Sequence, residues 1–127
     1  MTTNPHRRLK IFFDGGCRPN PGQMEFAVVI SGVVHVERDV GYGSSMDAEW
    51  LALLHALWLA RNYDPANVVL LGDSAAVINQ ANGVARAMGS SAVHLCNFKA
   101  LMMPWKAVRI RYIKRSQNLA GIALSRR

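Results

Sequence analysis

The chain has 127 residues, 50% of them hydrophobic, and a formal net charge of +7 at pH 7. This length suits one domain, predicted to span residues 1–127 with about residues 1–8 flexible. No apolar run is long enough to cross a membrane, and the N-terminus lacks the apolar stretch of a secretory signal. Two cysteines without metal-binding spacing argue against a disulfide framework, so we expect a cytoplasmic protein.

The charges are unevenly distributed along the chain. All eight Asp and Glu residues lie within residues 1–73, whereas nine of the 15 Lys and Arg residues lie beyond residue 73. A basic half favours a polyanionic partner, because Lys and Arg that neutralise phosphates release condensed counterions. Solubility is the simpler explanation of the same charge. On charge alone we favour nucleic acid as the partner.

The first half of the chain predicts three strands and a long helix. "LKIFF" is rich in β-forming residues and predicts a strand that ends at Asp14, before the turn sequence "CRPNPG". "MEFAVVISG" and "VVHVERDVG" predict two further strands. "MDAEWLALLHALWLARN" places apolar residues at helical spacing, with Ser44 or Ser45 as the helix N-cap.

The second half predicts one buried strand, "VVLLGDS", then two helices in "SAAVINQANG" and "SSAVHLCNFKALMM". "AVRIRYI" alternates as a strand, and "NLAGIALSRR" predicts a short C-terminal helix. The order βββαβααβα indicates an α/β fold, with helices packed on a mixed sheet.

Three acidic residues occupy positions suited to chemistry. Asp14 and Asp73 each follow a predicted strand, and Glu49 lies in the first turns of the long helix. If the two strands are neighbours, both Asp side chains emerge at the same edge of the sheet, where open sheets place ligands. Clustered carboxylates repel one another unless a divalent cation compensates, and Mg²⁺ binds oxygen ligands and phosphate. The pattern suggests metal-assisted phosphodiester hydrolysis.

Each of these residues also has a simpler interpretation. Asp14 could bond the backbone of "GGC", Asp73 with Ser74 could cap a helix, and Glu49 could be a first-turn acid favoured by the helix dipole. Spacing alone leaves catalysis and these structural roles about equal.

Four segments, "FFDGGCRPNPG", "SSMDAEWLALLHAL", "LLGDSAAVINQANG" and "RYIKRSQN", resemble the type 1 ribonuclease H family in order and spacing, from about Lys10 to the end. The resemblance implies the ribonuclease H-like fold, a five-stranded mixed sheet flanked by helices. It implies endonucleolytic cleavage of the RNA strand in RNA–DNA hybrids with two Mg²⁺ or Mn²⁺ ions and no organic cofactor. We expect a monomer.

The resemblance also implies roles for individual residues. Asp14 resembles the residue that bridges both metals, and Glu49 and Asp73 resemble ligands of the metal on the leaving-group side. Glu49 also resembles a residue that touches the RNA 2′-hydroxyl, which separates RNA from DNA. Positions expected to contact nucleic acid are Gly15, Cys17, Asn20, Ser44, Ser45, Met46 and Arg115.

The C-terminal part departs from the family, which places a fourth acid, an Asp, at the start of its last helix. A gapless alignment puts Ile122 at this position, whereas a shortened loop puts Asn118 there. We favour Asn118 as the fourth catalytic residue and metal ligand, with a role as helix N-cap as the alternative. Because Asn is neutral, we expect a weakly held water-activating metal and a greater dependence on Mn²⁺.

The basic insert that some family members carry after the third helix is also missing from the sequence. The leading hypothesis is a compact ribonuclease H acting on RNA–DNA hybrids. The main alternative is a catalytically weak or inactive domain of the same fold that binds hybrid or duplex nucleic acid. A related nuclease with DNA as substrate is a third possibility.

Overall fold

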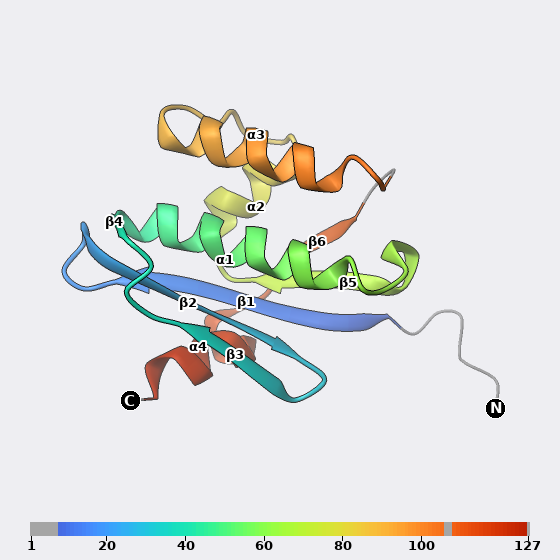
Figure 1. Ribbon diagram of the computed structural model, residues 1–127, viewed down its shortest axis with the longest axis horizontal. Helices are drawn as coiled ribbons and strands as arrows, with labels where there is room; N and C mark the ends of the chain where they lie inside the picture. The colour runs from blue at the N-terminus through green and yellow to red at the C-terminus, as the bar shows by residue number, and fades with distance from the viewer. Residues whose placement is uncertain (1–7, 106–107, 127) are drawn as a thin grey trace.

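The computed structural model describes residues 8–105 and 108–126. The segment expected to be flexible, about residues 1–8, lies outside these residues apart from Arg8. Among the described residues, no helix combines the length and apolar character needed to span a bilayer. The elements in chain order are β1 (Leu9–Cys17), β2 (Gly22–Ile30), β3 (Val33–Glu37), β4 (Tyr42–Gly43), α1 (Ser45–Ala60), η1 (Pro65–Asn67), β5 (Val68–Gly72), α2 (Ala75–Ala81), α3 (Ser90–Met102), β6 (Arg109–Tyr112), η2 (Arg115–Gln117) and α4 (Leu119–Ser125) (Figure 1).

The sheet is mixed, in the order β3-β2-β1-β5-β6, with the two-residue β4 paired to β2. The β1–β2 and β2–β3 pairs are antiparallel, and the β1–β5 and β5–β6 pairs are parallel. The predicted α/β fold and its order βββαβααβα are confirmed. The structure adds β4 and the 3₁₀ turns η1 and η2, which are too short to give a periodic pattern in the sequence.

The end of the first strand differs from the prediction. β1 does not stop at Asp14, because residues 15–17 continue the antiparallel pairing with residues 24–26 of β2. Its parallel pairing with β5, in contrast, ends at Phe12 and Leu71. Asp14 therefore lies two residues beyond the last β1–β5 pair, where β1 is still paired with β2 but no longer with β5.

Helices cover both faces of the sheet: α1 lies on one face with α3 stacked outside it, and α4 lies on the opposite face (Figure 1). Trp50, Leu53 and Leu57 of α1 are fully buried in a core shared with Ile11 and Phe13 of β1. Burying a side chain of this size stabilises a fold by about 1.5–3 kcal/mol. This packing fixes α1 against the strand that carries Asp14.

Candidate active site

Three carboxyl groups meet where β1, β5 and α1 come together. Asp14 comes from β1, Glu49 from the second turn of α1, and Asp73 from the residue after β5. One side-chain oxygen from each lies within 4.8 Å of the other two. The juxtaposition that the strand ends predicted is therefore present.

Glu49 is positioned by the close approach of α1 to β1. Ser44 caps α1 through a capping box with Asp47, as its side chain accepts a hydrogen bond from the backbone N–H of Asp47 at 3.0 Å. Gly15 allows the approach, since a Cβ at this position would lie 2.1 Å from the backbone oxygen of Ala48. The backbone N–H of Gly15 also donates a hydrogen bond to Glu49 Oε1. The glycine thus admits the helix and orients its carboxyl group.

Asp73 reaches the site because β5 runs parallel to β1 and ends at Gly72, directly before it. A Cβ at Gly72 would lie 2.5 Å from the Phe13 ring, so a glycine is needed for this packing. Arg115 Nε lies 3.9 Å from Asp73 Oδ2, but the Arg115 side chain is 94% exposed. Solvent screens such a pair, so Arg115 contributes little to holding Asp73.

Burial and mutual repulsion set the protonation of the site. Burial raises the pKa of Asp14 to about 6, with a further increase from the charge of Asp73. Burial raises the pKa of Glu49 to about 9, the charge of Asp14 adding to it. At neutral pH without a cation, this pair therefore retains a proton. Buried oxygen donors that repel one another form a donor set that fits Mg²⁺ or Mn²⁺, which would displace the proton.

The three acids open onto a cleft of about 720 Å³. Of the positions expected to contact nucleic acid, five line this cleft: Gly15, Cys17, Ser45, Met46 and Arg115. The remaining two, Asn20 and Ser44, are not among the residues that line the cleft, and both make hydrogen bonds within the protein. Their predicted nucleic-acid contacts, like those of the five, stay predictions.

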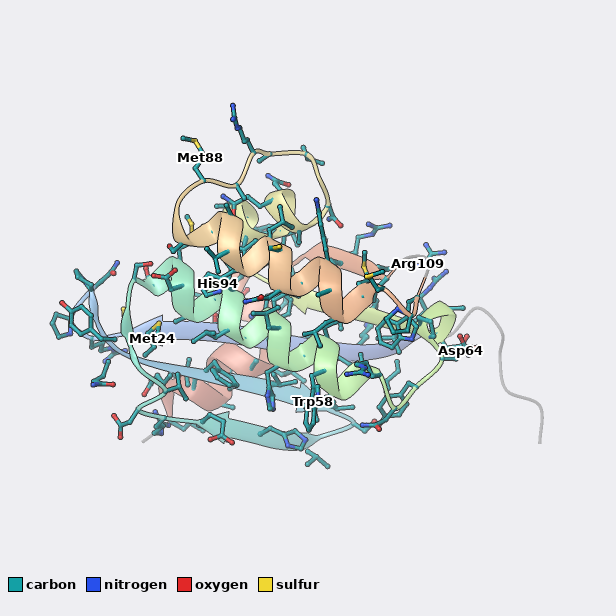
Figure 2. All side chains as sticks on the ribbon, turned by 45° about the horizontal axis from the view of Figure 1, so that its top comes forward. Met24, Trp58, Asp64, Met88, His94 and Arg109 are labelled. Carbon is teal, nitrogen blue, oxygen red and sulfur yellow. The ribbon has the colours of Figure 1, made fainter. Side chains whose placement is uncertain are left out.

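Asn20 and Ser44 both make hydrogen bonds that fix the start of α1 beside the cleft. Asn20 Oδ1 accepts a hydrogen bond from the backbone N–H of Ser45 at 3.0 Å, and Asn20 Nδ2 donates to Ser45 Oγ at 2.9 Å. Asn20 thereby ties the β1–β2 turn to the start of α1. Ser44 is engaged as the N-cap of the same helix. His94 of α3 (Figure 2) also contacts the first turn of α1, with its Nε2 3.0 Å from Asp47 Oδ1.

Asn118, favoured from the sequence as a metal ligand, makes a different set of contacts. It is fully buried, its Oδ1 accepts from the backbone N–H of Ala120 at 3.1 Å, and its Nδ2 donates to the carbonyl oxygen of Phe13 at 3.0 Å. It does not line the described cleft. The N-cap alternative is confirmed, and the ligand role of Asn118 stays a prediction.

The part of α4 that faces Asp14 is instead apolar. Ile122 lines the cleft and is 40% exposed. A Cβ at Gly121 would lie 3.3 Å from Asp14 Oδ2, so the helix backbone is close to the carboxyl group at this point. The gapless alternative, with Ile122 at the fourth position, is therefore the one that the geometry favours.

One acidic residue of the cleft was not among the predicted site residues. Glu25 of β2 lines the cleft and forms an ion pair with Arg38, whose Nη1 lies 2.6 Å from Glu25 Oε1. The available signal was a charge that interrupts the apolar run "MEFAVVI" opposite the glycines of β1.

The family model for reverse transcriptase-like proteins matches residues 12–127. The chain belongs to the reverse transcriptase-like family. Comparison with curated protein sequences gave no significant match.

Solved structures of type 1 ribonucleases H share the fold. RNase H1 from Halobacterium salinarum is 24% identical with a TM-score of 0.80, over 92% of this chain and 93% of that one. The N-terminal RNase H domain of a Mycobacterium tuberculosis protein is 21% identical with a TM-score of 0.78, over 93% and 94%. LC11-RNase H1 in complex with an RNA/DNA hybrid is 23% identical with a TM-score of 0.76, over 93% and 100%. LC11-RNase H1 was isolated from compost by a metagenomic approach. The resemblance to type 1 ribonuclease H is confirmed.

Proposed function

We propose that the protein is a metal-dependent endoribonuclease that hydrolyses the RNA strand of RNA–DNA hybrids. The observation that carries the proposal is the convergence of Asp14, Glu49 and Asp73 within 4.8 Å at an open cleft. The structure of LC11-RNase H1 with an RNA/DNA hybrid supports the choice of substrate.

Asp14, Glu49 and Asp73 would hold the Mg²⁺ or Mn²⁺ ions. When bound, these cations supply activation of water and neutralisation of charge on the phosphate. Asp14 lies between Glu49 and the α4 side of the cleft, which suits a ligand shared by two ions. Arg115, exposed at the rim, would neutralise a neighbouring phosphate and so position the strand.

Discrimination between RNA and DNA requires a group that reads the 2′-hydroxyl. Glu49 is the proposed reader, with Gly15, Cys17, Ser45 and Met46 providing the surface on which the hybrid lies. Asn20 and Ser44 would act there by keeping the start of α1 in place. Arg109 and Arg111 of β6 are exposed and would extend the positive surface.

Ile122 bears on the strength of metal binding. Because α4 presents an apolar side chain to the cleft, the cation on that side of Asp14 would receive no charged ligand from α4. We therefore propose a raised metal requirement and a preference for Mn²⁺. The same observation favours the second candidate, a domain that binds the hybrid and cuts it slowly or not at all. In either case we propose a monomer, since one chain supplies all three carboxylates. We also propose a cytoplasmic location.

The test compares labelled RNA–DNA hybrid, duplex DNA and duplex RNA, each with Mg²⁺ and with Mn²⁺. The proposal expects cleavage of the RNA strand of the hybrid alone, faster with Mn²⁺, and no cleavage by Asp14→Asn. Binding of the hybrid without cleavage in either metal would favour the second candidate. Cleavage of duplex DNA would point to the third possibility.

A further inference from the structure

We propose that Glu25 supplies the fourth carboxylate for the divalent cations, on the side of Asp14 where α4 offers none. This inference rests on the proposed function. It concerns a residue of β2, an element to which the sequence analysis gave no part in the site.

Glu25 and Asp14 point to the same face of the sheet. In the β1–β2 register, Asp14 is opposite Ala27 and Gly16 is opposite Glu25. Alternate residues of a strand share a face, and Ala27 packs against Ala120 and Leu124 of α4. Glu25 is thus a diagonal neighbour of Asp14 on the α4 face, and such neighbours are about 7–8 Å apart in antiparallel pairs. A glutamate side chain spans much of that separation.

The surface of the sheet between the two residues is open at Gly16. Gly16, directly opposite Glu25, shares the face of Asp14, and a Cβ built on it meets no described atom within 4 Å. Any other residue at this position would place a side chain between Glu25 and Asp14. The glycine therefore leaves room for a hydrated cation that both carboxylates would attract.

The Glu25 carboxylate is ionised and paired with a cationic side chain of the protein. Arg38 Nη1 contacts Glu25 Oε1 at 2.6 Å, and Arg38 Nη2 donates to the backbone oxygen of Arg126 at 3.3 Å. The Glu25 side chain is 16% exposed. Arg38 thus links Glu25 to the end of α4, and a divalent cation at the site would compete with Arg38 for the same carboxylate.

The charged residues of the cleft also favour Glu25 as the further ligand. Among the described residues that line it, Glu25 is the one carboxylate outside the group formed by Asp14, Glu49 and Asp73. The α4 wall consists of Gly121, Ile122, Leu124 and Ser125, which carry no charge. A second cation next to Asp14 would find its nearest additional negative charge on Glu25.

Calorimetric titration of the protein with Mn²⁺, without nucleic acid, tests the inference. We expect Glu25→Gln to weaken Mn²⁺ binding about tenfold and to raise the Mn²⁺ concentration for half-maximal hybrid cleavage to a similar extent. Glu37→Gln, an exposed carboxylate of β3 outside the cleft lining, is the matched control and should leave both quantities unchanged. Circular dichroism of each variant checks that the fold is intact.

Two further variants separate a cation role from a structural one. Arg38→Gln removes the ion pair but keeps the carboxylate, so Mn²⁺ binding should stay within twofold of the wild type or become tighter. A loss equal to that of Glu25→Gln would assign the effect to the ion pair and overturn the inference. Adding Ile122→Asp to Glu25→Gln should restore Mn²⁺ affinity, and no recovery would count against a shared cation.

The inference and the proposed function fail in different ways. If Glu25→Gln binds Mn²⁺ like the wild type while the wild type cleaves the hybrid, Glu25 has no such role and the proposed function stands. If the wild type neither binds Mn²⁺ nor cleaves the hybrid, both are overturned.

Discussion

The side-chain amide of Asn118 donates a hydrogen bond to the carbonyl oxygen of Phe13, the residue before Asp14, at 3.0 Å. Its other amide atom caps α4 by accepting from the backbone N–H of Ala120. One buried residue thus fixes the start of the last helix to the strand that carries the central carboxylate of the site. These contacts give Asn118 a structural role, and Ile122 is the α4 residue among the two candidates that lines the cleft.

Replacing Asn118 by Ala should destabilise the fold. The change removes a helix cap and leaves a buried carbonyl oxygen without its donor, which together cost about 2–4 kcal/mol. Urea unfolding measures this loss. Mn²⁺ affinity of the folded fraction should change less than threefold. A variant with wild-type stability but much weaker Mn²⁺ binding would restore the ligand interpretation.

The two glycines after Asp14 should tolerate substitution very differently. Gly15→Ala would place a Cβ 2.1 Å from the backbone oxygen of Ala48, so α1 must move away from β1 and carry Glu49 with it. We expect a loss of about 3 kcal/mol or more, as for severe overpacking, and loss of cleavage. Gly16→Ala meets no described atom within 4 Å and is the matched control for stability. Equal unfolding free energies for the two variants would contradict the described helix position.

Glu49→Gln should stabilise the protein in the absence of metal while abolishing cleavage. Burial raises the pKa of Glu49 from 4.5 to about 9, so the folded state holds the proton more tightly than the unfolded state. Stability from the protonated group is full below pH 4.5 and is lost as the pH rises toward 9. The increase in the free energy of unfolding caused by Glu49→Gln should be small at pH 4.5 and on the order of 2–3 kcal/mol at pH 7.5. The second figure is reduced because Glu49 and Asp14 share their protons.

Urea unfolding with EDTA at the two pH values measures the Glu49→Gln effect. Glu37→Gln serves as the exposed control and should be neutral at pH 7.5. A destabilised Glu49→Gln at pH 7.5 would mean that the carboxyl group is not under electrostatic strain in the fold.

Binding of the first divalent cation should release a proton near neutral pH. Burial raises the pKa of Asp14 to about 6 and of Glu49 to about 9, so the pair retains a proton that the cation displaces. Mn²⁺ affinity should therefore increase from pH 6 to pH 8. Titration calorimetry in two buffers of different ionisation enthalpy counts the protons. A binding constant independent of pH, with no proton released, would contradict the protonation described here.

The sequence predicted a mixed sheet with helices, because the order of elements along the chain follows from periodicity. The meeting of Asp14, Glu49 and Asp73 was predicted on the condition that their strands are neighbours, which the sheet order fulfils. The continuation of β1 past Asp14 was missed because two adjacent glycines usually indicate a turn. Here one of them, Gly15, serves the close approach of α1. Close approach depends on a partner that is 33 residues away in the chain, which local pattern does not reveal.

For a similar reason, the sequence could not decide between the two roles considered for Asn118 or reveal the place of Glu25 in the cleft. Whether an Asn before a helix faces a cleft or a buried carbonyl depends on the strand beneath it, here β1. The place of Glu25 depends on the β1–β2 register, which puts it opposite a glycine beside Asp14. Both facts are tertiary, and neither is encoded in the spacing of the motifs.

The most direct test of the central claim is the initial rate of RNA-strand cleavage in a labelled RNA–DNA hybrid with saturating Mn²⁺. We predict metal-dependent cleavage by the wild type, with a rate at least a hundredfold lower for Asp14→Asn, which keeps the shape of the site and removes its central charge. Equal rates for the two proteins, or no cleavage by the wild type despite bound hybrid and Mn²⁺, would contradict the account.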